Sequence, residues 1–280
     1  MRKQQLILIF TSILLLAGLY FFGNTINPNK PAPPPMAAAT SVSTLTTEQV
    51  LAKYQQGLDT QQVQKLIQLQ NSVVRGDVHE QQLHLYHQLA SYWKDSLHND
   101  EIGAYYTGEA AKLENSEKNL TFAAHLLLDN MMTSSDVSMQ RWLATRAKEL
   151  FDKALTINPN NDSSKIGVGA CYMFGNISDN PMQGILAVKE IADKNPDNMY
   201  AQMMLGMGGI QSGQYDKAIE RFLTVVKKQP DNIEAILNLA GVYERTGDKA
   251  NAVRWYKEAL KFIQIPEAKK EIEERIKSLQ

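Results

Sequence analysis

Apolar side chains recur at the helical spacing of three and four residues along most of the chain after residue 46. No segment sustains the period-two alternation that is typical of half-buried strands. Thr46 and Gln49 stand in capping-box spacing at the start of the first periodic segment. The pattern predicts an all-α fold downstream of this point.

Three segments in the second half of the chain align with one another. They are ATRAKELFDKALTINPNN (144–161), GQYDKAIERFLTVVKKQPDN (213–232) and GDKANAVRWYKEALKFIQIP (247–266). Positions 34 residues apart carry side chains of the same kind, as in the pairs Gly213 and Gly247, Ala218 and Ala252, and Phe222 and Tyr256. A repeat of this length predicts stacked supersecondary units, none of which can bury its apolar face alone.

These units resemble the tetratricopeptide repeat, a pair of antiparallel helices A and B. The family pattern of small and aromatic residues is carried by Ala147, Phe151 and Ala154, then Leu205, Gly206, Ala218 and Phe222, then Leu239, Ala240, Tyr243, Ala252, Tyr256 and Ala259. The unit ending at Pro196 departs from it at Gly184 and Val188, and Gly209 replaces an aromatic residue. Small residues let helices A and B approach closely. The resemblance implies an all-α, tetratricopeptide-like solenoid of antiparallel helix pairs.

The expected organisation has five parts. They are a cytoplasmic tip and transmembrane signal anchor (1–23), a Pro-, Ala-, Ser- and Thr-rich linker (24–45), a helical region of degenerate repeats (46–133), tetratricopeptide-like repeats (134–265) and a C-terminal capping helix (266–280). The last part opens with Pro266, which suits the first position of a helix.

Residues 6–23 form an apolar run without a charged side chain. The run is close to the ~20 residues that cross ~30 Å of hydrocarbon. Arg2 and Lys3 precede it, so the positive-inside rule predicts a cytoplasmic N-terminus and an extracytoplasmic, periplasmic C-terminal domain. The run is long and no A-x-A site follows closely, which favours an uncleaved inner-membrane anchor over a cleaved signal peptide. The proline-rich linker predicts a semi-stiff spacer after it.

The amino-acid composition argues against several classes of function. A formal net charge of −1 provides no global basic field, so nucleic acid is not an expected partner. The single cysteine, Cys171, excludes an intramolecular disulfide and a cysteine-based zinc cage, and its apolar setting predicts a buried structural thiol. No nucleophile motif, phosphate loop or cofactor motif is present.

A histidine cluster is the remaining candidate for chemistry. HEQQLH (79–84) is one residue too long for the H-E-x-x-H zinc signature, whose spacing puts both ligands on one helix face. His84 and His87 have helical i, i+3 spacing, but no third ligand is evident, so surface histidines are the preferred interpretation. The acids Asp231, Glu234 and Glu244 are interpreted as solvated helix faces.

The resemblance implies a groove lined by A helices. One subset of the family grips a peptide's terminal carboxylate with Lys, Asn and Arg, whereas the corresponding positions here are apolar apart from Asn238. The candidate groove residues are Tyr200, Met203, Met207, Ile210, Leu237, Asn238 and Gly241. Methionine adapts to varied partners, so the expected occupant is an apolar or amphipathic protein segment. In the alternative, the methionines contact neighbouring helices, or the N-terminal helices fill the groove.

The expected function is that of a non-catalytic, membrane-anchored adaptor that assists recruitment or assembly of an envelope complex. In this it resembles the anchored repeat proteins of bacterial envelopes, although such a fold-level analogy identifies no client. A stable accessory subunit that braces a membrane complex is the alternative. A metal-dependent enzyme built on the histidine cluster is a third hypothesis.

Overall fold

The computed structural model describes residues 45–72 and 78–280, and these segments are helical, without strands. The helices in chain order are α2 (Thr47–Gln55), α3 (Thr60–Gln70), α4 (Val78–Ser91), the π-helical turn η1 (Tyr92–Ser96), α5 (Asp100–Glu114), α6 (Glu117–Thr133), α7 (Val137–Ile157), α8 (Asp162–Phe174), α9 (Met182–Lys194), α10 (Met199–Gln211), α11 (Tyr215–Lys228), α12 (Ile233–Arg245), α13 (Lys249–Ala259) and α14 (Pro266–Leu279).

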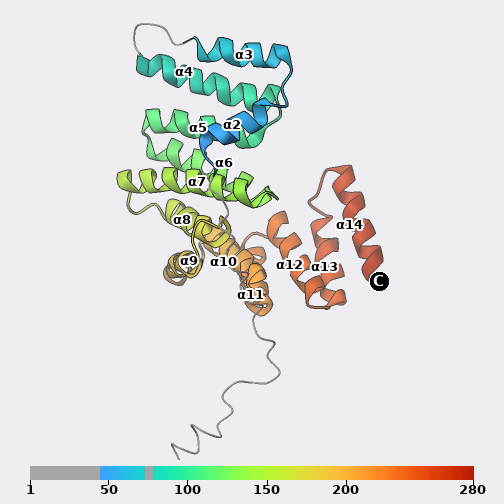
Figure 1. Ribbon diagram of the computed structural model, residues 1–280. Coiled ribbons are helices and arrows are strands. Elements are labelled where there is room, and N and C mark those ends of the chain that lie inside the picture. The colour runs from blue at the N-terminus through green and yellow to red at the C-terminus, as the bar shows by residue number, and fades with distance from the viewer. Residues whose placement is uncertain (1–44, 73–77) are drawn as a thin grey trace, which may run out of the picture. The chain divides into compact units, whose positions relative to one another are not determined.

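Consecutive helices pack as antiparallel hairpins that stack in chain order (Figure 1). The hairpins are α4/α5, α6/α7, α8/α9, α10/α11 and α12/α13, and each second helix also packs on the next first helix. The predicted all-α fold of tetratricopeptide-like helix pairs is therefore confirmed for the described residues. Helices α6 and α7 form one hairpin, which extends across the expected division at residue 133.

The turns between hairpins have a repeated chemistry. Asn161, Asn198 and Asn232 cap α8, α10 and α12, and each side-chain oxygen accepts a hydrogen bond from the backbone N–H three residues on, at 2.9–3.0 Å. Such caps satisfy one of the N–H groups that a helix start leaves unpaired. Within hairpins, Gly213 and Gly247 adopt positive φ angles of 71° and 80°, which a residue without a Cβ adopts freely.

A close contact between the two helices recurs in successive hairpins. A Cβ atom added at Gly206 of α10 would lie 2.6 Å from the Phe222 ring of α11, and one at Gly169 of α8 would lie 2.5 Å from Val188 of α9. The last hairpin places Ala240 and Tyr256 in one buried cluster. The small residue therefore provides the space that the large residue of the partner helix fills. The pairs Gly206/Phe222 and Ala240/Tyr256 are offset by the 34 residues that the repeat predicts.

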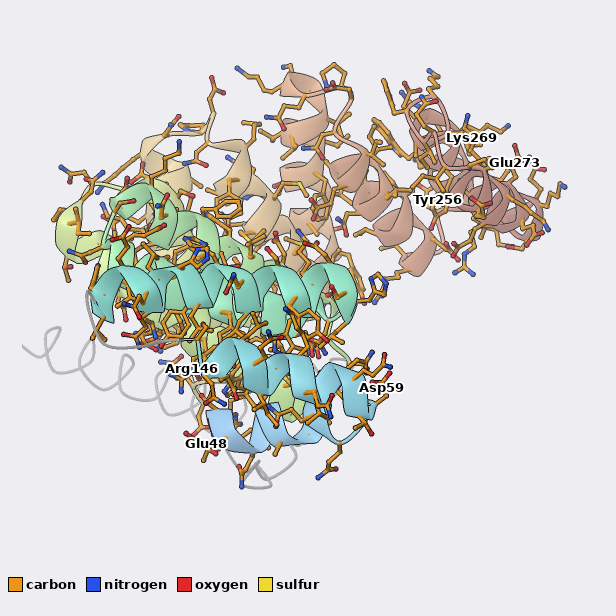
Figure 2. All side chains as sticks on the ribbon, turned by 90° about the horizontal axis from the view of Figure 1, so that it is seen from above. Glu48, Asp59, Arg146, Tyr256, Lys269 and Glu273 are labelled. Atoms are coloured by element: carbon orange, nitrogen blue, oxygen red, sulfur yellow. The ribbon has the colours of Figure 1, made fainter. Side chains whose placement is uncertain are left out.

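One core extends through the described helices from Val50 to Val242, and two smaller clusters hold α12, α13 and α14 together. Tyr256 lies beside α14, which carries Lys269 and Glu273 on its surface (Figure 2). The Tyr256 hydroxyl donates to Glu244 at 2.9 Å, and Arg275 of α14 pairs with the same carboxylate at 2.5 Å. Glu244 is thus a partner in the attachment of α14 and not a solvated acid, because its side chain is only 19% exposed.

Helix α2 is attached to the helices that follow it by polar contacts. The Lys53 ammonium lies 3.0 Å from the Asp136 carboxylate, and the Tyr54 hydroxyl donates to Glu101. In the segments 45–72 and 78–280, no helix is long and apolar enough to cross a membrane. The predicted anchor at 6–23 and most of the linker at 24–45 lie outside the described residues.

Candidate functional site: a methionine-rich groove

A groove of about 610 Å³ opens on the side of the stack formed by the first helices of the hairpins. Helices α6, α10 and α12 and the turn before α12 contribute its walls, which consist of Leu128, Asp129, Met132, Thr133, Met199, Tyr200, Met203, Met204, Met207, Gln229, Asn232, Glu234 and Asn238. None of the described residues before Leu128 lines it. The helices α2 to α5 therefore do not fill this groove.

Five methionines give the groove its apolar character. Met199, Met203 and Met207 follow one another at four-residue spacing on α10, Met204 stands beside them, and Met132 faces them from α6. Met203 is only 5% exposed and belongs to the core, whereas Met207 is half-buried and Met132 is 36% exposed. The unbranched, polarizable side chain of methionine adapts its shape to what it contacts. The groove thus has a buried floor at Met203 and more exposed edges at Met132 and Met207, whose side chains can change conformation.

An aromatic chain supports the groove from below. The Tyr200 ring lies edge-on to His125 of α6, with 5.4 Å between centroids, and His125 lies edge-on to Phe151 of α7 at 5.0 Å. The His125 ring also shares a hydrogen bond with the Ser163 hydroxyl of α8 at 2.8 Å. Burial lowers the pKa of His125, which favours the neutral ring. Helices α6, α8 and α10 are therefore tied together beneath the site.

Two carboxylates are the charged groups of the wall. Burial beside apolar side chains raises the pKa of Asp129. Burial also raises the pKa of Glu234, and the negative charge of Asp129 raises it further. Glu234 is exposed, as expected for a solvated helix face, and it also lines the groove. Desolvation and like charge both disfavour the ionised form of a carboxyl group.

Four of the seven candidate groove residues line the groove, namely Tyr200, Met203, Met207 and Asn238. The other three are placed elsewhere. Ile210 packs on the main core, Leu237 packs on the C-terminal clusters, and Gly241 has open space beside it. Ile210 lies two turns, about 10 Å, further along the α10 axis than Met203, and Met207 is the last residue of α10 that lines the groove.

The α6 wall was not predicted from the sequence. Leu128, Asp129 and Met132 belong to a helix without the small-and-aromatic pattern of the repeat, so nothing in the alignment placed them on an A helix. A usable signal was the single acid in the apolar run LLLDNMM (126–132), because a lone charge on the apolar side of a helix often marks a site.

The repeat-packing residues lie at the helix contacts. Eleven of them are buried: Ala147, Phe151, Ala154, Gly206, Ala218, Phe222, Leu239, Ala240, Ala252, Tyr256 and Ala259. Leu205 and Tyr243 are half-buried against the same core. Gly209 and Gly208 also have packing roles: a Cβ at Gly209 would lie 3.1 Å from the Ala218 Cβ, and one at Gly208 would lie 2.5 Å from the Met173 methyl group.

The other candidates for chemistry lie apart from the groove. Cys171 is fully buried, and this burial raises the pKa of its thiol to about 12. His84 and His87 border a shallow hollow on α4, where His87 lies 3.2 Å from the Glu114 carboxylate. Across the described ranges, no group of three or more His, Cys, Asp or Glu side chains is placed to hold a metal ion.

The stacked hairpins and their repeated small-to-large contacts define a helical repeat protein of the tetratricopeptide type. Comparison with known proteins agrees with this class. The family described as "Regulator of microtubule dynamics protein 1-3" matches residues 197–280, which include α10 to α14. "Interferon-induced protein with tetratricopeptide repeats 2" from Homo sapiens is 28% identical over 127 residues, which are 42% of this chain. The chain spans about a quarter (26%) of the length of that relative.

Several solved structures are similar to the chain in fold. "MamA 41-end from Desulfovibrio magneticus RS-1" is 20% identical with a TM-score of 0.42, and the match covers 68% of this chain and 97% of that one. PilW, described as a "widely conserved type IV pilus biogenesis factor", is 16% identical with a TM-score of 0.46, covering 70% and 92%. YrrB, "a TPR protein with an unusual peptide-binding site", is 17% identical with a TM-score of 0.41, covering 68% and 91%.

Proposed function

We propose that this protein is a non-catalytic adaptor whose groove holds an apolar or amphipathic segment of another protein. The observation that carries this proposal is the groove itself, in which five methionines from two A helices face a space of about 610 Å³. Methionine-rich surfaces accept helices or extended segments of varied sequence, because the side chain repacks at little cost. A helix laid in such a groove buries its apolar face.

The proposal includes attachment of the protein to a membrane. The uncharged run at 6–23, preceded by Arg2 and Lys3, supports a single inner-membrane anchor with the repeat domain on the periplasmic side. Such an anchor would concentrate the groove near envelope proteins whose assembly it assists. N-terminal sequencing of the protein from a bacterial membrane fraction is expected to begin at or near Met1, and a start after Ala39 would contradict an uncleaved anchor.

The variants that test the groove are chosen by the solvent exposure of the methionine side chains. Met132→Glu combined with Met207→Glu introduces two charges at adjustable edge positions, whereas Met203 belongs to the core and its substitution would disturb folding. Met182→Glu on α9 is the matched control, because Met182 is 51% exposed and does not line the groove. Circular dichroism of both proteins is expected to match the wild type.

The assay is in-cell photocrosslinking from a residue placed at position 133, because Thr133 lines the groove and is exposed. We expect defined protein adducts that are lost in Met132→Glu/Met207→Glu and retained in Met182→Glu. Adducts that persist in the double variant would contradict a groove-bound partner. Their stoichiometry separates two roles: an adaptor gives substoichiometric, exchangeable adducts, and a structural subunit gives one fixed complex after detergent extraction.

A further inference from the structure

We propose that the groove selects a segment with one basic side chain, Lys or Arg, set among apolar residues, and that the cation lies between Asp129 and Glu234. This inference rests on the proposed function and specifies the chemistry of the occupant. It follows from the charges of the wall, from an unpaired hydroxyl beneath it and from the end of helix α6.

The wall carries negative charge that the chain itself does not balance. Asp129 and Glu234 are its ionisable carboxylates, and no Lys, Arg or His is among the residues that line it. Neither carboxylate forms an ion pair with a basic side chain in the part of the chain that the structure describes, where thirteen other such pairs occur. A cation placed between them would offset the desolvation that raises the pKa of both carboxyls and the repulsion by Asp129 that raises the pKa of Glu234.

Tyr200 adds a polar group at the same place. Its hydroxyl is buried and finds no hydrogen-bond partner among the described residues. Burial is the main cause that raises the pKa of Tyr200, and Cys171, Asp129 and Glu234 add to it in that order. Buried polar groups normally have a partner, so an orphan inside a groove marks a position where a ligand completes the hydrogen bonding.

The end of α6 favours a cation as well. Helix C-termini carry a partial negative charge that basic side chains in the last turn usually balance. The last turn of α6 has no basic residue, and Asp129, Met132 and Thr133 at this end line the groove. A basic side chain of a bound segment would supply the missing positive charge.

An organic cation on an apolar segment fits this wall better than a metal ion. Two carboxylates are too few ligands for a dedicated metal site, and thioether sulfur is a poor ligand for the hard cations that carboxylates prefer. The methionines instead suit the hydrocarbon stem of Lys or Arg and the apolar residues on either side of it.

A peptide-display selection tests the inference without a known partner. Random 12-residue peptides are selected on the full chain in detergent micelles, and the best binder is measured by fluorescence anisotropy. We expect selected peptides to share one Lys or Arg with apolar residues three or four positions away. Replacing that basic residue by Met is expected to weaken binding to the wild type about tenfold, as for loss of a partly desolvated charge pair.

The matched protein variant is Asp129→Asn with Glu234→Gln, which keeps the shape of both side chains and removes their charge. In this variant the same peptide substitution is expected to change affinity less than twofold. Asp179→Asn with Glu273→Gln changes the net charge equally at exposed positions outside the groove and should retain the tenfold effect.

The outcomes distinguish the two proposals. The selection could give apolar peptides without a preference for Lys or Arg, and Met132→Glu/Met207→Glu could abolish their binding. This result would overturn the cation site and leave the groove as a binding site. A basic preference that survives in Asp129→Asn/Glu234→Gln would also overturn it. Binders that are indifferent to the methionine variant, or no binders at all, would overturn both proposals.

Discussion

Replacing Gly206 by Ala tests the packing contact on which the repeat is built. The glycine lies in the interior of α10, directly against the Phe222 ring of α11. A Cβ at this position would lie 2.6, 2.7 and 3.0 Å from three carbon atoms of that ring. Carbon atoms in favourable contact are about 3.5–4.0 Å apart, so the methyl group overlaps the ring by about 1 Å.

The magnitude follows from two opposing effects. Phe222 is fully buried, so overpacking against its ring is expected to cost about 1–3 kcal/mol. Ala is about 1 kcal/mol better than Gly inside a helix. The net effect of Gly206→Ala is therefore a loss of about 0–2 kcal/mol in the free energy of unfolding.

Gly241→Ala isolates the packing cost, because Gly241 lies inside α12 with nothing within 4 Å of an added Cβ. This variant has the helix gain alone and is expected to be about 1 kcal/mol more stable than the wild type. The two variants should differ by about 1–3 kcal/mol, since the propensity effect is common to both. For a chain of this size, each kcal/mol of difference in stability shifts Tm by about 2–4 °C.

Thermal and urea unfolding followed by far-ultraviolet circular dichroism provides the measurement. Phe222→Leu should partly rescue Gly206→Ala, because it removes the atoms that the new methyl group meets, and the two substitutions should therefore be less than additive. Equal stabilisation by Gly206→Ala and Gly241→Ala would refute the contact and the repeat register inferred from it.

Three further predictions concern titration, strain and reactivity. A carboxyl whose pKa is raised by folding destabilises the folded state at pH values above its unfolded pKa. The variant Asp129→Asn with Glu234→Gln should therefore be more stable than the wild type at neutral pH. The expected gain is ~0.5 kcal/mol, because both groups are exposed. This gain should vanish below about pH 3.5, where the carboxyls are protonated in both states of the wild type, and a gain that persists there would contradict the electrostatic cause. Gly247→Ala should lose about 1 kcal/mol in urea unfolding because φ is 80° at this turn, and an unchanged midpoint would argue against that geometry. Cys171 should react with a thiol reagent only upon unfolding, since burial raises its pKa to about 12, whereas rapid labelling of the native chain would show that the thiol is accessible.

The fold and the repeat register could be predicted because the contacts involved are short-range in sequence. Gly206 and Phe222 belong to one hairpin, so the 34-residue spacing of such pairs was sufficient to indicate which residues meet. The glycines at 208 and 209 had no evident role in the sequence. Their role depends on the depth at which neighbouring helices pack, and this is a property of the folded stack.

The groove was predicted only in part. Tyr200, Met203 and Met207 were identified from the A-helix position of α10, but the opposite wall comes from α6, about 70 residues earlier, which lacks the repeat pattern. The sequence also could not decide whether Met203 faces a partner or the interior. In the structure this side chain is 5% exposed in the core and also lines the groove.

The sequence by itself determined the helical class and, for α10/α11 and α12/α13, the pairing in hairpins and the small-to-large contacts, because local periodicity and capping dictate these features. Only the tertiary structure decided that Asp129 and Glu234 line one methionine-rich wall. The physical reason is that stacking brings together residues from three hairpins. The charge balance of a groove depends on all of its walls together, whereas each helix taken alone shows an acid on a solvated face.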